Sequence, residues 1–242
     1  AGENGLMSHE DFTIESLAAY LHLTPTQVSR LADRDQLPGR KVAGQWRFSP
    51  ADIHHWMEDR LGLQEEDKLA HVEAVLDGSA PADESAISVA SMLSPQAIAI
   101  PLAAKTRRSA IDSMAKLAAE TGMLWDPDAV AEAVLAREDM QPTALDNGVA
   151  LLHPRRPMAN ILAEPLLALG ISPQGIPFGG ARGRLTDLFF LICSTDERSH
   201  LRTLARLSRM ISDEAFLGEL RRAEDAARAH DFITAREAEV DE

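Results

Sequence analysis

The chain has 242 residues, of which 45% are hydrophobic and 26% charged, as is typical of one large or two modest soluble domains. No apolar run approaches the roughly 20 residues that cross a bilayer, and no secretory leader opens the chain, so we expect no membrane partner. Cys193 is the single cysteine, which excludes an internal disulfide and a cysteine-rich metal cage. We therefore expect a cytoplasmic protein with no metal or other cofactor, in which Cys193 is a buried, inert thiol.

The net charge of −14 is distributed over three segments of different character. Residues 8–62 are compact and patterned, residues 63–86 are acidic and resemble a short helix followed by a linker, and residues 87–235 alternate helical and strand-like stretches. Up to residue 62 the chain carries six Lys/Arg against nine Asp/Glu, a balance of −3. No segment has the strongly basic balance of a strong stand-alone DNA-binding domain.

The first segment predicts helix, tight turn, helix, hairpin and helix. Thr13 is a plausible N-cap for the first helix, and Thr24 followed by Pro25 starts the second. Residues 40–48 alternate around an Ala-Gly pair, which favours a hairpin, and a third helix begins near residue 49. This order is that of a small winged helix-turn-helix domain.

The stretches TIESLAAYLHLTPTQVSRLADRDQLPGRKV and GQWRFSPADIHHWM resemble the excisionase-like, MerR-related family of DNA-binding domains. The resemblance implies double-stranded DNA as a partner, with the second helix in the major groove and the wing on phosphates. It assigns base or backbone contacts to Thr26, Gln27, Ser29 and Arg30, and phosphate contacts to Arg40, Lys41 and Arg47. The acidic balance keeps an alternative open, in which the fold serves as a protein-docking module.

The second domain is predicted to be α/β. The predicted helices are residues 109–120, a helix capped by Asp126 with Pro127 in its first turn, and residues 200–211; the predicted strands are residues 149–152, 166–171 and 185–193. The last strand is almost continuously apolar, as in a strand covered on both faces. The last helix places Arg202, Arg206 and Arg209 on the face opposite its leucines, which suggests an interaction surface.

His153 follows directly on the strand at residues 149–152, with its exit fixed by Pro154 and with Arg155 and Arg156 beside it. We expect a side chain at this strand end to reach solvent. A neutral histidine has a nucleophilic nitrogen, and phosphoryl transfer needs little more than positioning and positive charge. Arginine is suited to the latter because its planar fork binds two phosphate oxygens.

These residues resemble the IIA domain of the fructose/mannitol/nitrogen-type phosphotransferase system (PTS), whose fold is a mixed sheet flanked by helices. The pattern is an Arg-Glu pair, a threonine, G-x-A-x-x-H and H-L-x-x-L-x-x-L. The resemblance implies that His153 accepts the phosphoryl group, that Arg137 stabilises it, and that Thr143 and His200 belong to the site, with Glu138 as the second member of the Arg-Glu pair. For His200 an alternative stays open, in which it is simply a histidine at a helix N-terminus. One departure is Leu152, which stands where the family usually has proline.

Three functions follow as hypotheses. The first is a PTS regulator that accepts phosphate on His153 from an HPr-like histidine phosphocarrier and thereby alters DNA or partner binding by the N-terminal domain. The second is a phosphocarrier for a sugar-transport IIB unit, with the N-terminal fold used for docking. The third is a binding protein that no longer transfers phosphate. A homodimer would strengthen weak half-site binding to DNA.

Overall fold

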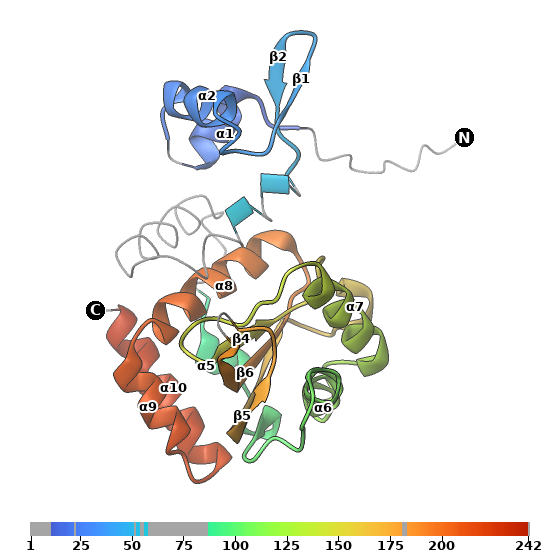
Figure 1. Ribbon diagram of the computed structural model, residues 1–242, viewed down its shortest axis with the longest axis vertical. Helices are drawn as coiled ribbons and strands as arrows, with labels where there is room; N and C mark the ends of the chain where they lie inside the picture. The colour runs from blue at the N-terminus through green and yellow to red at the C-terminus, as the bar shows by residue number, and fades with distance from the viewer. Residues whose placement is uncertain are drawn as a thin grey trace.

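The computed structural model describes residues 11–21, 23–50, 52–53, 56–57, 87–180 and 183–241. The N-terminal part contains α1 (Ile14–Tyr20), α2 (Pro25–Asp33) and a hairpin of β1 (Arg40–Val42) and β2 (Gln45–Arg47). Residues 52–53 and 56–57 are helical and lie where the third helix was predicted. The hairpin extends away from the rest of the molecule (Figure 1).

Local sequence explains these elements. Thr13 and Thr24 each form a capping box with the third helical residue, so both predicted caps are confirmed. Ala43 and Gly44, at φ values of 50° and 80°, form the turn between the strands, as a tight hairpin requires. The domain core is small and closes around side chains that are fully buried: Leu17, Val28, Phe48 and Ile53.

The C-terminal part contains the expected helices and strands in the expected order. Its helices are α5 (Val89–Met92), α6 (Arg107–Ala119), α7 (Pro127–Met140), α8 (Glu197–Ile211), α9 (Glu214–Arg221) and α10 (Ala226–Asp241), with 3-10 turns η1 (Pro95–Ala97) and η2 (Ala159–Ile161). Its strands are β3 (Ile98–Ala99), β4 (Val149–Leu152), β5 (Leu166–Pro177) and β6 (Leu185–Cys193). Strand β5 continues six residues beyond the predicted end at Ile171.

The four strands form one mixed sheet in the order β3-β5-β6-β4. Strand β4 runs parallel to β6, β6 runs antiparallel to β5, and β3 pairs parallel with β5. Helices α6 and α7 lie on one side of the sheet and α8 to α10 on the other (Figure 1). The α/β fold with a mixed sheet flanked by helices is therefore confirmed.

Burial explains why the central strands are continuously apolar. Every residue of β4 is buried, and β6 is buried from Leu188 to Cys193, because helices cover both faces. Burial raises the pKa of the Cys193 thiol to about 12, which keeps it protonated and unreactive. None of the helices in the described part of the chain is long and apolar enough to cross a membrane.

The prediction that the arginines of the helix at residues 200–211 form an interaction surface is wrong. Arg202 and Arg206 on α8 are buried, at 3% and 8% exposure. Helix α10 packs there, and Arg206 forms ion pairs with Glu237 and Asp241 of that helix. The sequence could not show this, because the partner carboxylates come more than 30 residues later on a helix that was not predicted. The predicted linker at residues 63–86 lies outside the described residues.

Candidate functional site

The site begins at the carboxyl end of β4. His153 follows the strand, but its side chain is only 3% exposed, so the expectation that it reaches solvent is wrong. Its Nδ1 lies 2.9 Å from the carbonyl oxygen of Leu151. A carbonyl oxygen can only accept, so Nδ1 carries a hydrogen and Nε2 carries the lone pair in the neutral ring. The local backbone thus selects which nitrogen is nucleophilic.

A second histidine ring faces the first. Helix α8 begins after Asp196, whose side chain accepts a hydrogen bond from the backbone N–H of Ser199. The first turn of α8 then carries His200, which is 5% exposed. The two ring centroids of His153 and His200 are 5.1 Å apart, with the planes inclined at 54°. The structure therefore brings together two residues that are 47 positions apart in the sequence.

Ser194 orients His200. Its Oγ lies 3.0 Å from Nδ1 of His200, and Ser194 itself directly follows β6, the neighbour of β4 in the sheet. Parallel strands end at the same edge of a sheet, which is why His153 and Ser194 emerge side by side. Sequence reasoning missed Ser194; its place directly after the late strand was the available signal.

The end of α7 holds the loop that approaches this edge. Glu138, which is 1% exposed, accepts hydrogen bonds from the backbone N–H of Thr143, at 3.1 Å to Oε2, and from the Thr143 hydroxyl. Burial raises the pKa of the Glu138 carboxyl, while these hydrogen bonds and the nearby His153 act to lower it. Glu138 and Thr143 are thus in direct contact, and Thr143 is positioned by Glu138.

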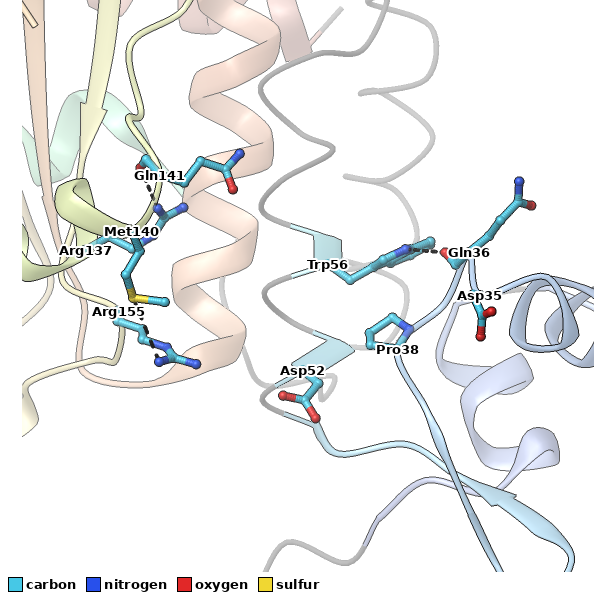
Figure 2. Close-up of a pocket in the computed structure, with 9 residues that line it drawn as sticks. All are labelled: Asp35, Gln36, Pro38, Asp52, Trp56, Arg137, Met140, Gln141 and Arg155. Atoms are coloured by element: carbon cyan, nitrogen blue, oxygen red, sulfur yellow. Dashed lines mark hydrogen bonds between the residues drawn. The ribbon is translucent and has the colours of Figure 1, made fainter. Parts of the chain in front are cut away.

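Arg137 lies one position earlier on the same helical turn and faces a cavity of about 480 Å³. Its Nη1 donates a hydrogen bond to the carbonyl oxygen of Gln141 at 2.8 Å, and this bond holds the guanidinium group in place. Arg155, two positions after His153, lines the same cavity. Figure 2 shows both arginines on one wall, with residues of the N-terminal domain on the opposite wall. Two guanidinium groups that line one cavity are suited to an anion with several oxygens.

The predicted nucleic-acid contacts lie on α2 and the hairpin. Thr26, Arg30 and Lys41 are exposed, and Ser29 is half-buried. The Gln27 side chain closes the capping box with Thr24, so part of its hydrogen-bonding capacity is used inside the domain.

The wing cations have partners within the domain. Arg40 forms an ion pair with Asp11 at 2.8 Å, and Arg47 donates to the Trp46 carbonyl at 2.9 Å and to Gln45 at 3.0 Å. The Lys41 ammonium lies 4.8 Å from the Trp46 ring centroid. The exposed cations that remain favour modest electrostatic attraction to DNA.

Comparison with known proteins agrees with this architecture. Residues 91–236 match the family model described as "Phosphoenolpyruvate-dependent sugar phosphotransferase system, EIIA 2", and residues 12–61 match a helix-turn-helix domain model. The nitrogen regulatory protein of Bradyrhizobium diazoefficiens is 30% identical over 148 residues, which are 60% of this chain and 94% of the relative. The fructose-specific EIIABC component of Bacillus subtilis is 28% identical over 149 residues, 61% of this chain but only 23% of that much longer protein.

Solved structures show the same fold at low sequence identity. The nitrogen regulatory protein IIA-Ntr of Neisseria meningitidis superposes with a TM-score of 0.54 at 19% identity, covering 60% of this chain and 98% of the other. The IIA mannitol structure from Escherichia coli gives a TM-score of 0.52 at 19% identity, covering 58% and 97%. With a family model that matches well over half of its length, this chain belongs to the PTS EIIA type 2 family and carries an N-terminal helix-turn-helix domain.

Proposed function

We propose that this protein is a PTS-linked regulator that accepts a phosphoryl group on His153 and uses it to control its N-terminal domain. The observation that carries the proposal is the His153 ring itself. Its Nδ1–H is held by the Leu151 carbonyl, which makes Nε2 the attacking nitrogen, and the ring lies against His200. The similarity to nitrogen regulatory proteins, which carry regulation in their names, supports a regulatory rather than a purely metabolic role.

The transfer step follows from this geometry. The donor is a phosphohistidine on an HPr-like carrier. Nε2 of His153 attacks the phosphorus in line, the donor N–P bond breaks, and the donor nitrogen recovers its electron pair. The donor ring leaves neutral because its other nitrogen keeps a proton. The positive charge moves to the His153 ring, whose Nδ1–H remains on the Leu151 carbonyl.

Three further residues have roles in this step. Arg137 neutralises the equatorial oxygens of the transferred group from the cavity wall. His200, oriented by Ser194, donates a hydrogen bond to a phosphoryl oxygen from its other ring nitrogen. Glu138 is a positioning residue, because it acts on the site through Thr143.

The DNA-binding part of the proposal rests on the exposed face of α2 and the hairpin. Thr26, Arg30 and Lys41 face solvent, as groove-contacting residues must. Because few cations are available, we expect weak binding that is lost as salt rises. A role in transcription regulation, whether of nitrogen metabolism or of another process, requires that the protein binds duplex DNA.

The test is intact-mass measurement after incubation with a phosphorylated histidine carrier, at alkaline pH because the phosphohistidine bond is acid-labile. The full chain should gain the mass of one phosphoryl group, and His153→Ala should gain none. His230→Ala is the matched control and should be phosphorylated normally, because His230 lies on α10 with its Nε2 at the Ala90 carbonyl. A full mass gain in His153→Ala would refute His153 as the acceptor.

A second measurement separates the regulator from a phosphocarrier for a IIB unit. The alternative is motivated by the solved complex of IIA mannitol with phosphorylated IIB mannitol from Escherichia coli, in which a protein of this fold binds a IIB unit. Gel shifts of the full chain at low salt, with Arg30→Ala as the variant and Arg228→Ala on α10 as the control, test DNA binding. If the full chain retards a DNA duplex in the gel, and Arg30→Ala abolishes this shift while Arg228→Ala does not, the regulator is supported. If no duplex is shifted, the phosphocarrier is favoured.

A further inference from the structure

Both histidine rings of the candidate site are covered. His153 is 3% exposed and His200 is 5% exposed. Phosphoryl transfer between two proteins needs the reacting atoms within about 3–3.5 Å of each other, which a carrier cannot achieve at a buried ring. Some part of the molecule must therefore move before the donor reaches Nε2 of His153.

The N-terminal domain lies beside this site. The cavity that Arg137 and Arg155 line from the C-terminal domain is lined on its other side by residues 35, 36 and 38 after α2 and by residues 52 and 56 (Figure 2). This second wall contributes the carboxylates of Asp35 and Asp52 and the Trp56 ring. Trp56 is fixed in its own domain, because its Nε1 donates to the Gln36 carbonyl at 2.6 Å.

The two walls have opposite charge. Guanidinium groups are on the C-terminal side and carboxylates on the N-terminal side, so the side chains that line the two walls attract each other locally. The end of α1 also lies within electrostatic range of the start of α8. Burial raises the pKa of the Tyr20 phenol at the end of α1, and the charges of Arg198 and Glu197 also act on it. Tyr20 is therefore close to the turn of α8 that carries His200.

We propose that the N-terminal domain is an intramolecular competitor of the phosphoryl donor: it docks beside His153 by charge complementarity and is expelled when His153 carries phosphate. The inference rests on the proposed function. It adds a defined docking surface, which consists of Arg137 and Arg155 facing Asp35 and Asp52.

The charge change explains the direction of the switch. A phosphoryl group adds about −1.5 to −2 charges at neutral pH. His153 lies two positions before Arg155, so a phosphoryl group on it adds negative charge on the guanidinium side of the cavity and weakens the attraction of that side for Asp35 and Asp52. Docking leaves Thr26, Arg30 and Lys41 exposed, so the docked state limits access of the donor rather than shielding the predicted DNA contacts.

The first test is the rate of phosphorylation of the full chain by a limiting amount of phosphorylated carrier. Asp35→Asn with Asp52→Asn removes the charges of the N-terminal wall, and asparagine tolerates the φ of 54° at position 35. With each carboxylate contributing about as much as a surface ion pair, roughly a threefold factor, the double variant should be phosphorylated roughly tenfold faster. Glu120→Gln with Asp128→Asn is the matched control, because both side chains are exposed and neither lines the cavity.

The second test measures the distance between the domains. Spin labels at Gln45→Cys and Lys116→Cys report on the N-terminal hairpin and on α6, and the buried Cys193 does not react. The unphosphorylated chain should give one narrow distance distribution, which broadens and shifts after phosphorylation but not in His153→Ala.

The outcomes separate the two proposals. If neither the wild-type chain nor any variant gains the mass of a phosphoryl group, both the proposed function and this inference are refuted. If the mass gain occurs while the distance distribution stays narrow, or while the double variant and its control react at equal rates, only the competitor inference is overturned. A faster double variant together with a broadened distribution supports it.

Discussion

Glu138 connects the stability of the C-terminal domain to the geometry of its site. Its carboxylate is 1% exposed and accepts two donors of Thr143, the backbone N–H and the hydroxyl. Hydrogen bonds to a charged group contribute about 1.5–3 kcal/mol each, so the pair has a gross value of about 3–6 kcal/mol. Desolvation of the carboxylate outweighs this gain, since the net effect on its pKa is a rise, but Glu138→Ala leaves both Thr143 donors without their acceptor. We therefore expect Glu138→Ala to lower the free energy of unfolding by about 2–4 kcal/mol.

The pH dependence of the Glu138→Gln variant gives a sharper test. Burial raises the folded-state pKa of Glu138 above its ordinary value of 4.5, so folding favours the protonated carboxyl. The stability that this group contributes is therefore fully present below pH 4.5 and is lost as the pH rises through the folded-state pKa. Glutamine keeps a neutral acceptor at all pH values. The free energy of unfolding of Glu138→Gln should therefore rise relative to that of the wild type as the pH increases, and this difference should become constant once Glu138 is fully ionised.

Urea denaturation followed by far-ultraviolet circular dichroism at about pH 5 and about pH 8 measures both effects. Asp139→Asn is the matched control: Asp139 is the next residue, its side chain is 65% exposed, and it pairs with Arg107. An exposed pair contributes about 0–1 kcal/mol, with no buried desolvation. The reasoning is refuted if Glu138→Ala is no less stable than Asp139→Asn, or if the Glu138→Gln profile runs parallel to that of the wild type.

Further predictions concern the packing around the site. Glu237→Ala should lower the free energy of unfolding by about 3–5 kcal/mol in urea titrations, because it removes the buried partner of Arg206 and the acceptor for two backbone N–H groups. Glu239→Ala is the control and should lower it by less than about 1 kcal/mol, because Glu239 is exposed. Gly148→Ala should lower the melting temperature measured by calorimetry, because the position has a φ of +86° and the added carbon would lie 2.9 Å from a carboxylate oxygen. Cys193 should react with a thiol reagent only after unfolding, as followed by mass spectrometry; rapid labelling of the native chain would contradict its burial.

Much of the fold was predictable from local signals. The caps at Thr13, Thr24 and Asp126 start helices where the sequence places them, since capping depends on residues three positions apart. The apolar runs that became β4 and β6 were equally clear, because a strand covered on both faces needs no polar positions. The Arg-Glu pair, the threonine and the two histidines were singled out by the resemblance of their order and spacing to the IIA family.

The sequence by itself determined which residues could do chemistry and which segments would be helix or strand, because these depend on side-chain type and short-range periodicity. Only the tertiary structure decided how those residues meet: that His153 is buried against His200, that α10 covers the arginines of α8, and that Arg137 and Arg155 face Asp35 and Asp52 across a cavity. These contacts join groups far apart in the chain. Burial and charge pairing are set by what packs opposite a residue, which the pattern of its neighbours in sequence does not contain.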